Sequence, residues 1–278
     1  MGFQIIFYLF YGLISGVTEF MPVSAAANSY LLEELTSYQT RHPLTLLLIH
    51  FACLLVVLIQ CRHRIGHMRR ELHLQWQQPQ VRKRQPDRVT VLDGKIAMMS
   101  ALPIVIMLAF SGYTYQMLTS TLSLSILLIT SGILIYVPQF QPGANRTSYH
   151  VTPLESLCMG VFGGLSVMPG LSRMGCYLTL GLLRGWDRKY VLDIAFLVSV
   201  PALAILIILD LVSLIVVGFA AITTGFLLCS ILAGLAAFAG AWLAMVIMRY
   251  LCSGANYSGF AYYSWGLGLF TFILYLMV

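Results

Sequence analysis

Glu19 and Arg173 are the side chains with the clearest potential for chemistry, because each interrupts a long apolar stretch. Glu19 lies in the segment Phe3–Ser24 and Arg173 lies in the segment Leu157–Leu183, and both segments are broken by Gly and Pro. At the depth of a membrane, an ionised side chain costs several kcal/mol unless it is paired or hydrated, which makes it a functional candidate. Two alternatives stay open, a structural ion pair between two parts of the chain and an interfacial side chain that reaches water.

Arg173 lies in a glycine-flanked turn that could bind an anion. The segment reads Pro-Gly-Leu-Ser-Arg-Met-Gly from residue 169 and leads into an apolar helix. Backbone N–H groups at the start of a helix bind phosphate, and a neighbouring guanidinium strengthens the binding. We therefore predict that Ser172 and Arg173, with the backbone of Gly170 and Gly175, hold a phosphate group.

The two interrupted segments share a pattern. One reads Gly-Val-Thr-Glu-Phe-Met-Pro from residue 16, the other reads Gly-Gly-Leu-Ser-Val-Met-Pro from residue 163, and a hydroxyl follows each at Ser24 and Ser172. Broken helices at corresponding positions of two halves are typical of inverted-repeat membrane proteins with a site near the bilayer midplane. The pattern predicts one membrane domain over residues 1–278, with repeat halves 1–150 and 151–278.

The composition indicates which elements position these residues. The chain is 59% hydrophobic and 9% charged, with a mean hydropathy of +0.85, whereas soluble domains carry about 25% charged residues. So few charges cannot cover a soluble globule, which excludes a soluble enzyme, a disordered chain and a secreted disulfide scaffold. The apolar runs are continuous rather than alternating, which favours membrane helices over a barrel.

Six apolar stretches are long enough to cross a bilayer, which takes about 20 helical residues. They are residues 44–60, 96–112, 122–138, 194–217, 220–248 and 260–278. The two interrupted segments would enter the membrane and return, an arrangement tolerated where the backbone is buried in protein or lines water. The predicted fold is therefore an all-α polytopic membrane protein with six transmembrane helices and two re-entrant helical segments in an inverted repeat.

Half of the Lys and Arg residues fall in the segment 61–88, between two predicted spans. Positively charged connections mark the cytoplasmic side of a membrane protein. We expect this basic loop to be cytoplasmic, next to anionic lipid headgroups, with nucleic acid excluded as a partner. His63 and His67 have the i, i+4 spacing of a helical metal site, but a solvated basic face is the favoured interpretation.

Three stretches resemble signature segments of the undecaprenyl-pyrophosphate phosphatase family, the bacterial bacitracin-resistance membrane proteins. Residues 15–28, SGVTEFMPVSAAAN, are similar to the family's E-G-x-T-E-F-L-P-V-S-S-x-G-H. Residues 169–177, PGLSRMGCY, are similar to P-G-x-S-R-S-G-x-T. Residues 193–201, DIAFLVSVP, which precede Asp210, are similar to the family's acidic-F-x-F-L-L-A-x-P. With the length and the pattern of spans, the resemblance covers essentially the whole chain.

The resemblance implies an enzyme that removes the terminal phosphate of undecaprenyl pyrophosphate at the periplasmic side of the bacterial inner membrane. It implies help from a divalent cation, Mg²⁺ or Ca²⁺, frequent homodimers, and recycling of the carrier lipid for peptidoglycan synthesis. The predicted catalytic residues are Glu19, Ser24, Ser172 and Arg173. Glu19 is also the candidate metal ligand, and the predicted substrate contacts are Thr18, Asn28, Gly170 and Gly175.

The chain departs from the family pattern at Ser15, Ala25, Ala27, Asn28, Met174 and Tyr177. Ala25 replaces a serine proposed as nucleophile or phosphate ligand, and Asn28 replaces an imidazole. A general acid–base group is worth about 10²–10⁴ in rate, so hydrolysis should be crippled unless Ser24, Ser29 or Tyr177 substitutes. Whether the chain is an active enzyme therefore stays open. The alternative is a non-catalytic relative that binds polyprenyl phosphate or moves it across the membrane, and a small-solute transporter is a weaker third hypothesis.

Three further polar residues lie in predicted spans or at their edges. His50 is interpreted either as a displaced proton donor or as a hydrogen-bonded core or interfacial histidine, with the second favoured. Asp193 and Asp210 are expected to have structural roles, as helix caps or as partners of the cations at residues 184, 188 and 189.

Overall fold

The described part of the chain is helical, with no β-strand among its residues. The computed structural model describes residues 2–36, 42–77, 88–113, 120–141, 145–219, 222–252 and 257–277. The helices in chain order are α1 Gly2–Phe20, α2 Ala25–Thr36, α3 Pro43–Gln60, α4 Arg62–Gln77, α5 Arg88–Ala109, α7 Thr121–Tyr136, α8 Pro153–Gly164, α9 Arg173–Leu183, α10 Arg188–Val217, α11 Thr224–Cys252 and α12 Ser258–Met277. Short 3₁₀ turns lie at Val137–Phe140, Ser148–His150 and Leu165–Val167.

Six of the described helices are long and apolar enough to cross a membrane, as predicted. They are α3, α5, α7, α10, α11 and α12. Two of them begin earlier than hydropathy indicated, because polar residues continue the helix beyond the apolar run. At α10 the side chain of Asp187 caps the helix by accepting a hydrogen bond from the N–H of Tyr190 at 3.0 Å. A cap of this kind lets a helix start among charged residues.

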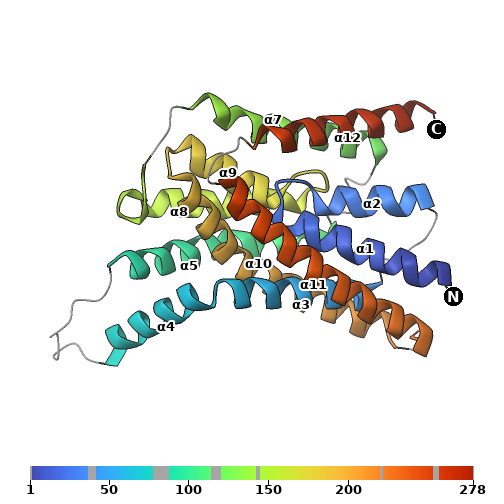
Figure 1. Cartoon of the computed structure of the whole chain (residues 1–278), viewed down its shortest axis with the longest axis horizontal. Helices are drawn as coiled ribbons and strands as arrows, with labels where there is room; N and C mark the ends of the chain where they lie inside the picture. Colours follow the sequence, from blue (N-terminus) through green and yellow to red (C-terminus); the bar gives the residue numbers. More distant parts are fainter. Residues whose placement is uncertain are drawn as a thin grey trace.

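The two interrupted segments each form a pair of helices joined by a turn. In the first pair α1 and α2 flank residues 21–24, and in the second α8 and α9 flank residues 165–172. Figure 1 shows α1 and α2 at the end of the molecule that carries both termini, whereas α8 starts at the opposite end. Each pair is followed by three of the long helices, the order that an inverted repeat would have. The inverted repeat and the re-entrant insertion stay predictions.

Close backbone contacts fix the first helix of each pair against a long helix of the other half. At Gly12 and Gly16 an added Cβ atom would lie 2.1 Å from the carbonyl oxygens of Ala233 and Ala237, so α1 lies directly on the backbone of α11. At Gly160 of α8 an added Cβ atom would lie 2.2 Å from the carbonyl oxygen of Ser100, so α8 lies directly on the backbone of α5. Small residues allow such close approach between membrane helices, and here they hold both turns in place.

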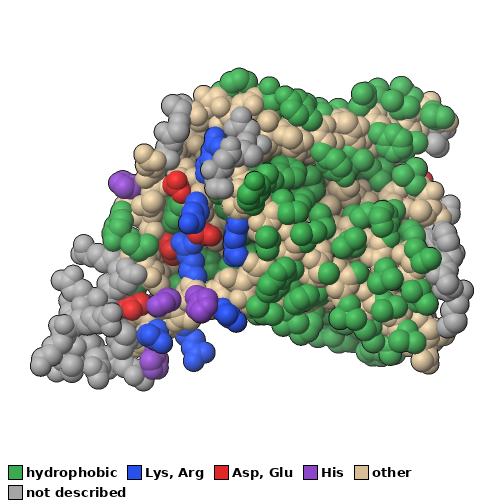
Figure 2. All heavy atoms as spheres, viewed as in Figure 1, with side chains coloured by type: hydrophobic (Ala, Val, Ile, Leu, Met, Phe, Trp, Pro, Cys, Tyr) green, Lys and Arg blue, Asp and Glu red, His purple; other side chains and the backbone are tan. Residues whose placement is uncertain are grey.

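Charged side chains gather at one end of the molecule, and the rest of the visible face is largely apolar (Figure 2). Residues 62–77 of the predicted basic loop form helix α4, and residues 78–87 lie outside the described residues. Arg64 of α4 is paired rather than free in solvent, because its guanidinium forms ion pairs with Asp93 at 2.7 Å and with Asp193 at 2.6 Å. Asp193 therefore has the structural role that was expected, with Arg64 of α4 as a partner that the sequence does not indicate. A carboxylate as buried as Asp93, 3% exposed, requires a cation or donor beside it.

A second charge cluster fastens the start of α8. The Glu155 carboxylate accepts three hydrogen bonds. The donors are Nε of Arg184 at 2.7 Å, Nη1 of Arg146 at 3.1 Å and the backbone N–H of Thr152 at 2.8 Å. Burial opposes ionisation of this carboxylate, but the hydrogen bonds from Thr152 and the two arginines prevail and lower the pKa of Glu155 below its ordinary value. The cluster ties residue 146, before α8, to the end of α9.

Candidate functional site

Glu19 and Arg173 meet where the two helical pairs come together. Glu19 lies in the last turn of α1, Arg173 is the first residue of α9, and the Oε1 and Nη2 atoms of the pair are 3.0 Å apart. Their side chains are 8% and 13% exposed. The contact is an ion pair without hydrogen-bond alignment, since Glu19 Oε1 has no aligned donor among the described residues. The structural pair that the sequence left open therefore exists.

Two donor atoms of the Arg173 guanidinium have no acceptor among the described residues. Its Nε and Nη1 atoms are buried, and neither has a hydrogen-bond partner within the described ranges. Buried donors without partners are rare in proteins, because each carries the full cost of lost hydration. An oxyanion beside the guanidinium could accept charge-assisted hydrogen bonds from these donors, the kind of contact by which arginine binds phosphate.

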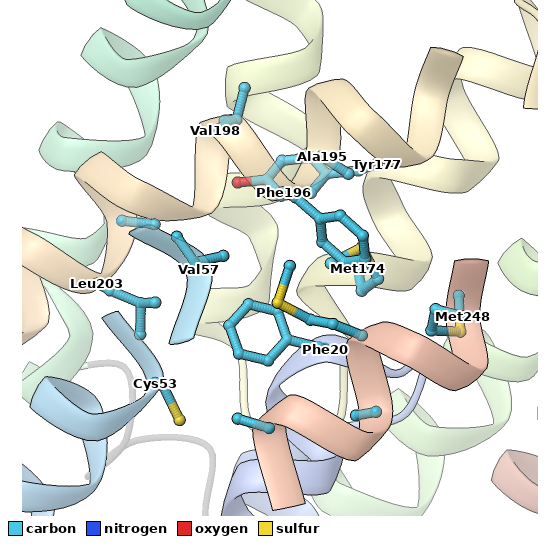
Figure 3. Close-up of a cluster of buried hydrophobic side chains, with 14 of the residues drawn as sticks. Phe20, Cys53, Val57, Met174, Tyr177, Ala195, Phe196, Val198, Leu203 and Met248 are labelled. Carbon is cyan, nitrogen blue, oxygen red and sulfur yellow. The ribbon is translucent and has the colours of Figure 1, made fainter. Parts of the chain in front are cut away.

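The residues that follow Glu19 and Arg173 in sequence are buried apolar side chains. Phe20 and Met174, the neighbours of Glu19 and Arg173 in sequence, are 0% and 1% exposed and lie together with Phe196 in Figure 3. The rings of Phe20 and Phe196 pack edge to face with centroids 6.1 Å apart. A low-polarity surrounding strengthens every charged contact made inside it. A phosphate bound by Arg173 would therefore be held strongly.

Ser24 joins the two turns to each other. Its hydroxyl oxygen accepts the N–H of Ala27 at 3.2 Å, which caps α2, and the N–H of Gly170 at 3.1 Å, across the interface between the halves. Gly170 has a φ of +120°, which a residue with a side chain rarely adopts. The Ser24 hydroxyl is thus an acceptor that holds the second turn against the first.

Ser172 has the corresponding role at the start of α9. Its hydroxyl accepts the N–H of Gly175 at 3.0 Å and donates to the carbonyl of Met21, in the other turn, at 3.5 Å. Neither Ser172 nor Ser24 is bonded to a carboxylate or imidazole in the described part of the chain. A serine nucleophile requires a base within hydrogen-bond reach, so in this arrangement both hydroxyls position the turns.

The turn amides predicted to bind phosphate already have hydroxyl partners. The N–H of Gly170 bonds Ser24, the N–H of Ser172 bonds Ser131 of α7 at 3.2 Å, and the N–H of Gly175 bonds Ser172. These bonds rigidify the turn around Arg173. They leave the guanidinium as the main donor that the site offers to an anion.

Thr18 and Asn28 lie beside the site but bond elsewhere. The Thr18 hydroxyl donates to the carbonyl of Ile14 in its own helix at 2.8 Å. The Asn28 amide donates to the carbonyl of Ser24 at 2.8 Å, and its oxygen accepts the hydroxyl of Tyr263 from α12. Asn28 thus braces the first turn against α12. The predicted substrate contacts of Thr18 and Asn28 stay predictions.

Tyr177, named above as a replacement for a lost group, lies close to the ion pair. Its ring is 0% exposed, and it packs so tightly on Gly163 that an added Cβ there would lie 1.9 Å from it. Its hydroxyl is buried without a hydrogen-bond partner in the described structure, and the charges of Arg173 and Glu19 both act on it. Tyr177 is therefore a second unpaired donor beside the candidate site.

His50 and Asp210 form a pair that the sequence analysis did not foresee. The Nδ1 of His50 in α3 lies 2.6 Å from the Oδ2 of Asp210 in α10. The favoured interpretation of His50 as a hydrogen-bonded histidine is confirmed, but the expected partners of Asp210 were wrong. The available signal was the presence of one ionisable residue in each of two apolar spans, since each needs a partner at membrane depth.

The carboxylates of the described residues make no metal cluster. No group of three or more His, Cys, Asp or Glu side chains among them could surround a metal ion. Glu19 is the carboxylate that lies against Arg173, and its role as a metal ligand stays a prediction.

The comparisons with known proteins identify the family of the chain. A family model described as "Bacitracin resistance protein BacA" matches residues 8–270. The undecaprenyl-diphosphatase of Carboxydothermus hydrogenoformans is 27% identical over 267 residues, which covers 96% of this chain and 95% of that protein. The undecaprenyl-diphosphatase of Halothermothrix orenii is 25% identical over 272 residues, 96% of each chain. Undecaprenyl-diphosphatase 1 of Shouchella clausii is 27% identical over 269 residues, 94% of this chain and 93% of that protein.

Proposed function

Because the chain belongs to the bacitracin resistance protein BacA family, we propose that it is an undecaprenyl-diphosphatase, which hydrolyses undecaprenyl pyrophosphate to undecaprenyl phosphate and inorganic phosphate. The observation that carries this proposal is the presence of two unpaired donors on the Arg173 guanidinium, since Nε and Nη1 are buried and free of partners in the described structure. In this proposal the Arg173 guanidinium binds the terminal phosphate through donors that no protein acceptor occupies in the described structure.

The position of Glu19 supports a role for a divalent cation. A carboxylate next to a pyrophosphate is a like-charge contact, which is unfavourable unless a cation lies between the two. Mg²⁺ is commonly bound by one or two carboxylates, with substrate phosphates and water completing its shell, whereas Ca²⁺ takes six to eight oxygen ligands. One carboxylate, Glu19, therefore fits Mg²⁺ better than Ca²⁺. When bound, the cation would neutralise charge on the pyrophosphate.

The chain's own residues favour direct attack by water over a phosphoserine intermediate. The hydroxyls of Ser24 and Ser172 are engaged with backbone groups, and neither is bonded to a base among the residues that the structure describes. Phosphoryl transfer depends mainly on positioning and on neutralising charge. Arg173 supplies both, and the serine-bonded turns keep its guanidinium in place.

The bacterial inner membrane is the location that the family implies, and the six apolar helices make the chain a multi-pass membrane protein. The site opening to the periplasm, and the segment 61–88 facing the cytoplasm, are parts of the proposal. The gathering of charge at one end (Figure 2) supports that orientation, since basic connections favour the cytoplasmic side. A homodimer is also proposed, and light scattering of the detergent complex tests it.

A basic groove between α3 and α4 supports anionic phospholipids as neighbours. The groove has a volume of about 600 Å³, and it is lined by Leu58, Arg62, Ile65, Gly66, Arg69, Arg70 and His73. Its apolar floor suits an acyl chain, and its cations suit a phosphate headgroup. Native mass spectrometry should detect more phosphatidylglycerol than phosphatidylcholine on the wild type. Replacing Arg69 and Arg70 together by Gln should remove that preference, and an unchanged preference would contradict the proposal.

Phosphate release tests the enzymatic proposal. The purified protein, with Mg²⁺ and undecaprenyl pyrophosphate in detergent, should release inorganic phosphate. Arg173→Ala and Glu19→Gln should each reduce the release by at least about 10²-fold, the scale of a lost charged contact in catalysis. Glu34→Gln, which removes an exposed carboxylate, should leave it unchanged. Binding of the lipid without release would contradict hydrolysis and support the non-catalytic binder or translocase.

A further inference from the structure

The His50–Asp210 pair has no part in the site as described so far. Its side chains are 18% and 13% exposed, and the Nδ1–Oδ2 distance of 2.6 Å is that of a short charge-assisted hydrogen bond. A polar pair in two transmembrane helices is expensive to keep, and its retention is a reason to seek a function. A structural bond between α3 and α10 would need no ionisable residue, since two apolar side chains pack equally well.

The pair lies next to the cluster that surrounds Glu19 and Arg173. On α3, His50, Cys53 and Val57 are spaced i, i+3 and i+7 and share one face. Cys53 and Val57 are fully buried in the cluster that also contains Phe20 and Met174 (Figure 3). The exposed fraction of the side chain rises from Cys53 to His50, which is 18% exposed. The imidazole therefore lies at the edge of the cluster nearest the start of α3.

Asp210 reaches the same edge from α10. Leu203, seven residues before it and on the same face of that helix, belongs to the cluster and is drawn with Cys53 in Figure 3. Charged groups from three elements act on the imidazole, namely Glu19 of α1, Arg173 of α9 and its bonded partner Asp210. The charges of Glu19 and Arg173 also act on Cys53, less than one turn away. His50 is therefore within electrostatic range of the ion pair.

We propose that His50, oriented by Asp210, is the general base that accepts a proton from the water attacking the terminal phosphate. The inference rests on the hydrolysis proposed above. The Asp210 carboxylate keeps the proton of His50 on Nδ1, so Nε2 carries the lone pair, the arrangement by which a carboxylate prepares a histidine base.

The water oxygen forms a bond to the terminal phosphorus, and the bond from that phosphorus to the bridging oxygen breaks. The electron pair of the broken bond stays on the lipid phosphate. One water proton passes to Nε2 of His50 and then to solvent, and the oxygen of the water leaves within inorganic phosphate.

An imidazole is the side chain whose ordinary protonation change lies near neutral pH, which suits a base in hydrolysis. The alternatives near the site are engaged or weak bases, because Ser24 and Ser172 cap helices and Glu19 faces Arg173. Among the described residues, the imidazole supplied by α3 is the candidate whose chemistry suits a base best.

Phosphate release at saturating undecaprenyl pyrophosphate tests the inference. His50→Gln should lower kcat by about 10²–10⁴-fold, with KM within about threefold, because Gln keeps a hydrogen bond to Asp210. Asp210→Asn, at the positioning residue, should lower kcat by at least about tenfold, again with little change in KM. His150→Gln, which changes an exposed histidine at the opposite end, is the matched control and should match the wild type.

Chemical rescue separates catalysis from structure. Added imidazole should restore release by His50→Gly at least about tenfold and should do nothing for Arg173→Ala. Wild-type release by His50→Gln would overturn the inference alone and leave the proposed function standing. A His50→Gly variant that binds the lipid normally but is not rescued would overturn the base role. No release by the wild type would overturn the proposed function and the inference with it.

Discussion

Replacing Glu19 by Gln should destabilise the protein more than removing both charges of the Glu19–Arg173 pair. The two side chains are 8% and 13% exposed, so solvent screens their interaction little. Removing one partner of a buried pair costs about 3–5 kcal/mol, because the other charge stays buried alone. Since Nε and Nη1 of Arg173 already lack partners in the described structure, the pair is imperfect, and we expect the lower limit of about 3 kcal/mol.

Thermal unfolding in detergent measures this effect. A chain of this size should lose about 2–4 °C per kcal/mol, so Glu19→Gln should lower Tm by about 6–12 °C. The double variant Glu19→Gln/Arg173→Gln should recover at least half of that loss, since no isolated charge remains. Glu34→Gln is the control and should change stability by less than about 0.5 kcal/mol. Single-variant effects that add within about 0.5 kcal/mol in the double variant would refute the interaction.

Three further predictions concern the parts that hold the site. Ser24→Ala should lower stability by about 1–2 kcal/mol, because two backbone N–H groups lose their acceptor. Hydrogen exchange of backbone amides should then rise at both turns, and unchanged exchange would contradict the link between the turns. Gly16→Leu should abolish the folded protein peak in size-exclusion chromatography in detergent, because a Cβ there would lie 2.1 Å from the Ala237 oxygen. The control Gly259→Ala should elute as the wild type does, because a Cβ at Gly259 meets nothing within 4 Å. The pKa of Glu155 is lowered from 4.5 in the folded protein. The stabilisation of the folded state by its ionised carboxylate should therefore be complete above pH 4.5 and should disappear as the pH falls through the lowered pKa. Tm measured against pH should show this loss in the wild type and not in Glu155→Gln.

The elements of the fold could be predicted from sequence because hydropathy reports burial in lipid directly. All six long helices lie where apolar runs indicated them. Their starts were less predictable, since α5 and α10 continue into charged residues that a side-chain cap such as Asp187 makes tolerable. Helix α4 was interpreted as a loop, because its polar sequence carries no apolar periodicity and its attachment depends on Arg64 reaching two distant carboxylates.

The candidate site was predictable in its residues and less so in their roles. Glu19 and Arg173 could be recognised from the cost of charge in an apolar stretch, and the structure brings them together. The motif does not reveal that the Ser24 hydroxyl accepts the N–H of Gly170, because that bond joins residues half a chain apart. The partner of Asp210 was missed for the same reason, since spacing along one helix says nothing about the helix packed against it.

Binding of the lipid product to the purified protein tests the central claim, that Arg173 holds the phosphate where the two turns meet. Undecaprenyl phosphate should be titrated into the wild type and into Arg173→Ala, with the bound lipid counted by native mass spectrometry. Loss of one charged hydrogen bond costs about 1.5–3 kcal/mol, so the account predicts at least about tenfold weaker binding by Arg173→Ala. Equal affinity of the two proteins for the lipid would contradict it.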